Sequence, residues 1–185
     1  MARQRRDSLS DKAGGCVKTM FGKNNSDQEL LKTRIKECPL FSDLSGSEVR
    51  SLLEISHIRD YSEGEKIFTH GTIGLCFYII VKGSVNIISE SAKQVHVLKE
   101  LTEGAYFSEV HLFSETTHTV SAAAAQITRL IVFAKPDFED LVKKEPKLGN
   151  KTLIKFLEFF GEKLDELYRE NKELKTRLHS AIDQI

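Results

Sequence analysis

Two apolar runs joined by one glycine decide the fold, and they lie within YSEGEKIFTHGTIGLCFYIIVKGSVNI at residues 61–87. The runs FYIIV and SVNII are short and rich in β-branched residues, which is typical of strands. Gly83 stands between them, where a tight hairpin would use a residue with positive φ. Further short apolar runs continue to residue 133, and turn residues separate them. The pattern predicts an antiparallel β-barrel or sandwich.

Helical spacing frames these strands on both sides. Apolar residues recur at helical intervals over residues 26–38, and Pro39 ends that helix because it pushes the preceding residue out of the α region. Ser45 stands three residues before Glu48, the capping-box arrangement at the start of a second helix. Pro136 opens another helix after the last strand. We therefore predict an α+β fold: a small antiparallel β-barrel (double-stranded β-helix or jelly roll) flanked by helices, with a long C-terminal coiled-coil helix.

Composition divides the chain into three parts. Residues 1–25 are basic and poor in apolar side chains, so we expect a disordered tail. A partner-binding peptide is the alternative for this tail, because three apolar residues in its second half would share one face of a short helix. Residues 26–150 are the domain that holds the barrel, and residues 151–185 are the C-terminal dimerisation helix.

The overall charge and the cysteines argue against several classes of protein. The 185 residues carry 27 basic and 27 acidic side chains, so no net charge points to nucleic acid or to a membrane surface. The longest apolar stretches are too short to span a bilayer, and no secretory signal opens the chain. The three cysteines form neither a disulfide framework nor a metal-ligand spacing. We expect a cytoplasmic protein.

The order of motifs resembles the cyclic-nucleotide-binding domain family, which includes bacterial catabolite activator proteins, kinase regulatory subunits and cyclic-nucleotide-gated channels. Residues 61–87 resemble its first strands, with Gly71 and Gly83 at the expected turns. The stretch LTEGAYFSEVHLF at residues 101–113 resembles the start of its phosphate-binding cassette. The resemblance covers residues 39–148 and implies the helix-flanked barrel predicted above.

A jelly roll of the cupin type is the alternative interpretation of the strands. Such a barrel lacks the N-terminal helices and uses a cluster of His and carboxylate metal ligands. The six histidines of this chain show no such spacing. We expect no metal site.

The cassette of the resembled family reads Phe-Gly-Glu, then a short helix, then Arg and a small residue. There the Glu accepts a hydrogen bond from the ribose hydroxyl, the Gly lets backbone amides approach the ligand, and the Arg binds the cyclic phosphate. This chain keeps the Phe and the Glu, has Ser in place of Gly, and has His followed by Thr in place of Arg and the small residue. The resemblance implies a ligand site at Phe107, Ser108, Glu109, Val110, His118 and Thr119.

The missing arginine lowers the expected affinity for cyclic AMP or cyclic GMP. Removing one member of a buried charged pair costs on the order of 2–5 kcal/mol, which is roughly thirty- to several-thousand-fold in affinity. The reference pKa of His is about 6.5, so we expect weak binding that tightens toward pH 6, where a protonated His118 pairs with the phosphate. The alternative is a barrel that has lost the nucleotide and kept its shape, with His111 filling part of the pocket.

The C-terminal segment carries an a/d heptad pattern, which is typical of a coiled coil. The seam residues are Leu157, Phe160, Leu164, Leu167, Asn171, Leu174, Leu178, Ala181 and Ile185. Asn171 falls at a central a position, where a buried amide favours two parallel strands in register. Glu170 would then lie beside Lys175 of the partner subunit. We expect a parallel homodimer; the alternative is a long helix lying against its own barrel, which the polar faces beyond about residue 166 disfavour.

No nucleophile–base pair, paired carboxylates, phosphate loop or metal cluster stands out, so we expect no enzyme and no cofactor. Two functions remain: a cyclic nucleotide sensor, in which Phe156 and Phe159 are candidates for a lid over the base, or an adaptor with a degenerate pocket. No helix-turn-helix, enzyme domain or channel follows the coiled coil. We therefore expect output through a separate effector protein, without direct contact to nucleic acid or to a membrane.

Overall fold

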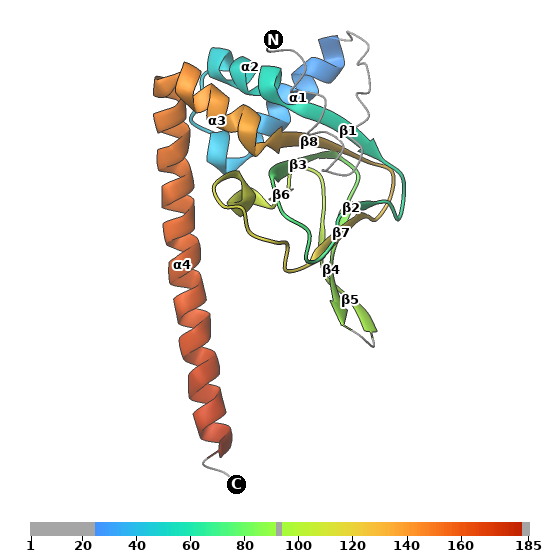
Figure 1. The fold of residues 1–185 in the computed structure, drawn as a ribbon, viewed down its shortest axis with the longest axis vertical. Coiled ribbons are helices and arrows are strands. Elements are labelled where there is room, and N and C mark those ends of the chain that lie inside the picture. Colours follow the sequence, from blue (N-terminus) through green and yellow to red (C-terminus); the bar gives the residue numbers. More distant parts are fainter. Residues whose placement is uncertain (1–24, 92–93, 183–185) are drawn as a thin grey trace.

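The computed structural model of the chain describes residues 25–91 and 94–182 (Figure 1). The predicted tail lies outside the described residues except for residue 25, so both of its interpretations stay predictions. The helices are α1 (Asn25–Glu37), η1 (Pro39–Phe41), α2 (Gly46–Ile55), η2 (Glu109–Leu112), α3 (Lys135–Lys144) and α4 (Pro146–Ile182). The strands are β1 (His57–Tyr61), β2 (Lys66–Phe68), β3 (Cys76–Lys82), β4 (Val85–Ser91), β5 (Gln94–Leu101), β6 (Tyr106–Phe107), β7 (Ser121–Ala124) and β8 (Thr128–Ala134).

The strands form two antiparallel four-stranded sheets. Their orders are β1-β8-β3-β6 and β2-β7-β4-β5. The first two strands therefore pair with the last two, β1 with β8 and β2 with β7. This wrapping of the early strands onto the late ones is the jelly-roll arrangement, and the predicted α+β fold class is confirmed.

The link between β3 and β4 is not the predicted hairpin. β3 pairs with β6 and β8, whereas β4 pairs with β5 and β7. Gly83 does have the expected positive φ, at 92°, but its turn carries the chain from one sheet to the other. A Cβ at Gly83 would lie 2.5 Å from the Ile127 carbonyl oxygen, so packing as well as φ requires glycine. The sequence prediction failed on pairing because β3 pairs with β6 and β8, which lie far along the chain, while β4 pairs with the following strand β5 and with β7.

Strand β3 is buried on both faces and separates two hydrophobic cores. Phe77, Ile79 and Val81 belong to the core beneath the helices, while Tyr78 and Ile80 belong to the core inside the barrel. Alternate residues of a strand point to opposite faces, so β3 contributes to both cores at once.

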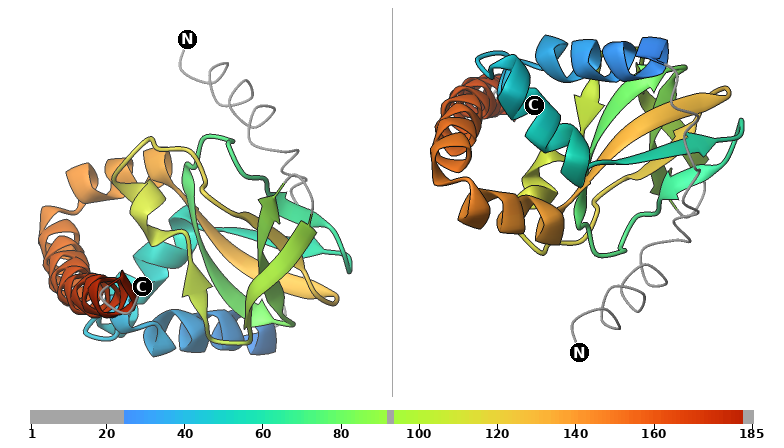
Figure 2. Two further views of the ribbon diagram at one scale, coloured as in Figure 1. Left: turned by 90° about the horizontal axis from the view of Figure 1, so that it is seen from below. Right: turned by 90° about the horizontal axis from the view of Figure 1, so that it is seen from above.

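The helices α2, α3 and α4 gather on one side of the sheets (Figure 2). The predicted capping box of α2 is confirmed: the Ser45 N–H donates to Glu48 Oε2 at 2.6 Å, and the Glu48 N–H donates to Ser45 Oγ at 3.4 Å. The same Glu48 carboxylate accepts from Lys151 Nζ of α4 at 3.1 Å. Lys155 Nζ pairs with Asp43 Oδ2 at 2.9 Å. Two ion pairs therefore tie the N-terminal part of α4 to α2 and to the turn before it.

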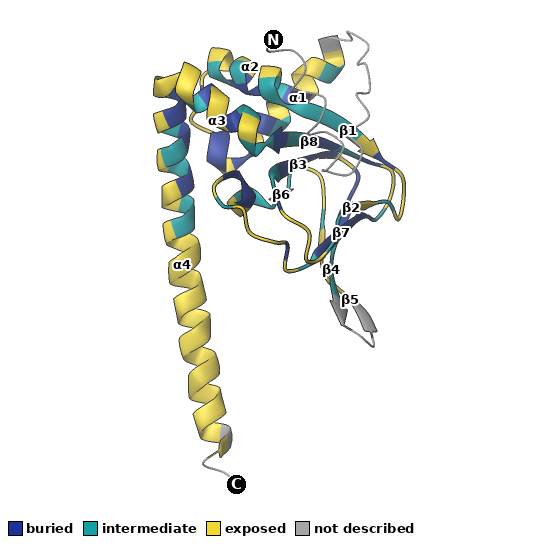
Figure 3. Cartoon of the chain, in the orientation of Figure 1, coloured by how far each residue is buried: buried dark blue, intermediate teal, exposed yellow. Residues whose placement is uncertain are grey.

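Helix α4 changes its surroundings along its length (Figure 3). Phe156 is 1% exposed and packs edge-on against Phe41 and Phe77, so it belongs to the core. Every residue from 161 to 180 is exposed, so a helix lying against its own barrel is wrong for this segment. Phe160, a predicted seam residue, is partly buried and packs against the core of its own domain, so the seam prediction is least clear at this position.

The other predicted seam residues leave an exposed apolar stripe on α4. More than half of the surface is exposed for Leu157, Leu164, Leu167, Leu174 and Leu178. Asn171 is exposed within the same stripe. The side chain of Ala181 and the whole of Ile185 lie outside the described residues.

Candidate functional site

The segment with the cassette pattern runs from β6 through η2 to the start of β7. Phe107 on β6 is buried and lies opposite Tyr78 of β3, with the two rings stacked at 5.0 Å between centroids. This stacking fixes one end of the segment in the barrel core. Phe107 therefore serves as a packing residue that positions the two residues after it.

Ser108 stands at the N-cap of η2 in a left-handed conformation, with φ of 69° and ψ of 23°. It has the only positive φ among the non-glycine residues that the structure describes. Its buried hydroxyl has no hydrogen-bond partner. The backbone thus keeps the conformation that the glycine of the resembled cassette adopts with ease, and the serine is strained by it.

Glu109 follows at the first position of η2 and is largely buried. Burial raises the pKa of the Glu109 carboxyl above its usual range, while its own backbone N–H and the Lys163 ammonium of α4 oppose that shift. Nearby, Tyr106 packs edge-on against Phe159 of α4, with ring centroids 6.0 Å apart. The carboxyl group therefore lies where the barrel meets α4, within electrostatic reach of that helix.

Three aromatic rings pack in a row at the other end of the segment, and we call Phe68, His118 and His111 the ring column. The His118 and Phe68 rings are parallel at 3.7 Å between centroids, and the His111 ring meets His118 edge-on at 4.3 Å. A Cβ at Gly74 would lie 2.3 Å from His111 Cγ, so the absent side chain makes room for this ring. The Gly71 N–H donates to the His118 carbonyl at 2.8 Å and holds the column in place.

The ring column keeps His118 neutral. Burial, and then the neighbouring His111, lower the pKa of His118 from its usual 6.5 to about 4. Burial in the ligand-free structure opposes protonation of His118 near pH 6, so the pH dependence predicted from the sequence requires a bound phosphate that raises this pKa. Burial also lowers the pKa of His111, whose Nδ1 is buried and has no hydrogen-bond partner.

The structure separates the remaining predicted site residues from this interior. Val110 and Thr119 are exposed. Of the two lid candidates, Phe156 is in the core, whereas Phe159 lies against Tyr106 at the edge of the barrel. Sequence reasoning missed the contributions of Phe68, Gly74 and Lys163, because only the tertiary fold brings them to the cassette.

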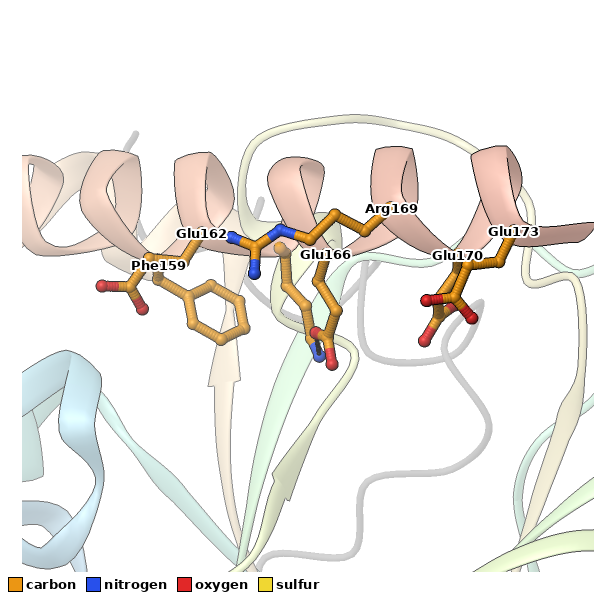
Figure 4. A pocket seen from close by; sticks show the side chains of 7 residues that line it. Phe159, Glu162, Glu166, Arg169, Glu170 and Glu173 are labelled. Atoms are coloured by element: carbon orange, nitrogen blue, oxygen red, sulfur yellow. Dashed lines mark hydrogen bonds and ion pairs between the residues drawn. The ribbon is translucent and has the colours of Figure 1, made fainter. Parts of the chain in front are cut away.

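A hollow of about 400 Å³ runs along α4 on the side of Phe159 (Figure 4). Its lining residues are Phe159, Glu162, Lys163, Glu166, Arg169, Glu170 and Glu173. Lys163 pairs with Glu166 on the same helix. The wall is mostly acidic, with two cations and one aromatic ring.

Comparison with known proteins agrees with the architecture. Residues 58–145 match the family model described as the cyclic nucleotide-binding domain. The chain is 30% identical over 105 residues to a cAMP-dependent protein kinase regulatory subunit of Mycosarcoma maydis, which covers 57% of this chain and 20% of that protein. It is 30% identical over 117 residues to the cyclic AMP receptor protein of Thermus thermophilus, which covers 63% of this chain and 54% of that protein. The chain thus spans about half of one relative and a fifth of the other.

Two solved structures share the fold. The catabolite activator protein of Thermus thermophilus superposes with a TM-score of 0.65 at 27% identity, over 74% of this chain and 63% of that chain. A cyclic nucleotide-binding domain from Methylobacillus flagellatus superposes with a TM-score of 0.66 at 25% identity, over 78% of this chain and 82% of that chain.

Neither membrane spans nor metal clusters emerge from the part of the chain that the structure describes. No described helix combines the length and the apolar character needed to cross a bilayer. Within residues 25–91 and 94–182, no three His, Cys, Asp or Glu side chains gather in a way that could hold a metal ion.

The ring column predicts a pH-dependent stability. The unfolded chain binds a proton at His118 with a pKa near 6.5, whereas the folded chain does so near 4. The unfolded state therefore holds more protons between these values, and the contribution of His118 to stability is present above pH 6.5 and is lost as the pH falls toward 4. His118→Phe, which keeps the stacked ring, should reduce this loss by up to about 3 kcal/mol in urea unfolding at pH 4.5 against pH 7.5. His179→Gln on the exposed part of α4 is the control, and equal pH profiles for all three proteins would contradict the prediction.

The strain at position 108 gives a second prediction. Ser108→Gly relieves the strain of a left-handed conformation, about 1–2 kcal/mol, and removes a buried hydroxyl that has no hydrogen-bond partner. The greater conformational entropy of glycine in the unfolded chain lowers the stability by roughly 0.4–1 kcal/mol. We expect a net gain of about 1 kcal/mol, or about 2–4 °C in Tm. Ser114→Gly, whose φ is negative, should destabilise the protein. A Tm that falls in both variants would show that position 108 is not strained.

Proposed function

We propose that this chain, which carries a cyclic nucleotide-binding domain over residues 58–145, is a dimeric regulatory module that senses a cyclic nucleotide weakly and acts on a separate effector protein. The observation that carries the proposal is the placement of Glu109. Its carboxyl group stands at the end of β6, where a family member binds ribose, and it lies within electrostatic reach of Lys163 on α4. A ligand bound at Glu109 would therefore act on the helix that leaves the domain.

The exposed stripe of α4 supports the parallel dimer in this proposal. The leucines on this part of α4 stay exposed to water unless a second helix covers them. Their heptad spacing suits a second copy of the same helix. Asn171 lies among the leucines and would pair with its own copy only in a parallel, in-register arrangement. Glu170 and Lys175 would then form an ion pair between the helices. The effector would bind according to the position or spacing of the two domains in the dimer.

A ligand-independent adaptor is the second candidate, and the ring column favours it. His118, which stands at the sequence position of the phosphate-binding arginine of the resembled cassette, is packed between Phe68 and His111 in this column. A neutral imidazole offers one donor and no charge to a phosphate, so most of the affinity expected of the family is missing. In this function the barrel is a scaffold and the dimer holds a partner protein by avidity. In both functions we infer a cytoplasmic protein without catalytic activity.

Calorimetric titration with cyclic AMP and cyclic GMP separates the two functions. We expect weak binding by the native protein, because a neutral His118 offers no charge to the phosphate. A bound phosphate raises the pKa of His118 from its ligand-free value of about 4, so binding that tightens toward pH 6 would show that His118 pairs with the ligand. The double variant Ser108→Gly, His118→Arg restores the cationic fork and should bind about thirtyfold more tightly or better. Adding Glu109→Gln to the double variant should abolish the gain. Absence of binding by the native protein and by the double variant would reject the sensor and leave the adaptor.

Truncation tests the dimer. Removing residues 164–185 keeps Phe156, Phe159 and Phe160, which pack on the core, and deletes most of the stripe. The truncated protein should remain folded and sediment as a monomer at concentrations where the full chain is a dimer. Asn171→Leu should raise thermal stability and admit trimers or antiparallel pairs, because a buried amide lowers stability but specifies the strand number. A full chain that sediments as a monomer up to 100 μM, or an antiparallel pair, would contradict the proposed assembly.

A further inference from the structure

The hollow along α4 lies on the side of the helix that faces the barrel (Figure 4). At its domain end, Phe159 packs edge-on against Tyr106 of β6, and the Lys163 ammonium lies within electrostatic reach of Glu109. None of the exposed leucines of the stripe lines the hollow. A second helix that covers the stripe therefore does not need to cover the hollow as well.

The hollow carries a surplus of negative charge. Four of its lining residues are glutamates, against one lysine and one arginine. The Lys163 ammonium is already paired with Glu166. Within the described part of the chain, Glu162 and Glu170 form no ion pair, and Glu173 lies 4.0 Å from Arg177. The hollow therefore offers carboxylates that no cation of the described residues neutralises.

The N-terminal tail carries the opposite charge. Residues 1–24, which lie outside the described residues, hold six basic and two acidic side chains, so residues 25–185 hold 21 basic and 25 acidic ones. The two parts of the chain therefore attract each other. A chain of 24 residues spans up to about 80 Å, and the 37 residues of α4 span about 55 Å, so the tail is long enough to reach the hollow.

The order of side chains along the tail matches the order along the hollow. Counted outward from residue 25, the three apolar residues within 17–21 come first, and the arginine-rich residues 3–6 come last. Counted outward from the domain, the hollow begins with the ring of Phe159 and ends at Glu173. A tail that follows α4 outward places its apolar residues beside the ring and its guanidinium groups beside carboxylates, which they bind through paired hydrogen bonds.

We propose that residues 3–21 bind in the hollow of α4 in their own chain. The hollow is then an interaction surface for a basic segment, and it lies beside the cassette because Phe159 packs on Tyr106. This binding requires neither a cyclic nucleotide nor a second copy, so it stands apart from the proposed function. The attraction is electrostatic and exposed to water, so salt weakens it.

Paramagnetic broadening from a nitroxide on Cys16 tests the proposal in the full chain. Burial raises the pKa of the Cys38 thiol to about 12, so it reacts poorly with the label, and Cys76→Ser removes the other described cysteine. The amide signals of residues 159–173 should weaken several-fold with the active nitroxide and recover when it is reduced. They should also recover in about 1 M NaCl, where the Debye length falls to about 3 Å.

Two double variants with the same loss of charge locate the binding surface. Glu162→Gln with Glu173→Gln removes two carboxylates of the hollow and should reduce the broadening several-fold. Glu54→Gln with Glu63→Gln is the matched control, because both residues are exposed and lie outside the hollow. Equal broadening in the two double variants, or no broadening at residues 159–173 in the native chain, would overturn the proposal.

A mixed sample decides whose tail occupies the hollow. Spin-labelled chains without ¹⁵N are mixed with ¹⁵N-labelled chains without the nitroxide, so only contacts between chains cause broadening. The signals of residues 159–173 should keep most of their intensity in this sample. Broadening as strong as in the singly prepared chain would show that the tail binds a second copy, and this outcome would also overturn the proposal.

Discussion

The burial of β3 on both faces is the constraint on which the rest of the structure depends. Its alternate side chains belong to two cores, one inside the barrel and one beneath the helices. A shift of this strand by one residue would exchange the two sets and disrupt both cores. Because Tyr78 stacks on Phe107, β3 also sets the position of the cassette. Because Phe77 packs against Phe156, the same strand holds the first turns of α4.

The cassette joins two ends of opposite chemical character. At the α4 end, Glu109 is a largely buried carboxyl group with a raised pKa. At the other end, the position of the expected cation holds His118, a neutral imidazole stacked on Phe68. The segment holds Ser108 in a left-handed conformation, which glycine adopts readily, and has no arginine at the position where the resembled cassette binds a phosphate.

Helix α4 begins against the domain and extends away from it (Figure 1). Its first turns are fixed by Phe156 and by the ion pairs of Lys151 and Lys155, so the direction in which it leaves the domain is set by the core. Its exposed length carries leucines that a single domain leaves uncovered. Because the N-terminal part of α4 is packed on the domain and the rest is exposed, a small rotation of the packed part would move the C-terminal end of the helix by a larger distance.

The sequence by itself determined every feature that depends on neighbouring residues. Pro39 ended α1, Ser45 and Glu48 capped α2, Gly83 took a positive φ, and the motif order identified the barrel and its cassette. Only the tertiary structure decided that β3 and β4 lie in different sheets, that Phe160 faces its own core, and that His118 is buried against Phe68 and stays neutral. Local φ preferences, caps and periodicity are set by bonded neighbours and short hydrogen bonds. Strand pairing and the pKa of a buried imidazole depend instead on groups that only the folded chain brings together.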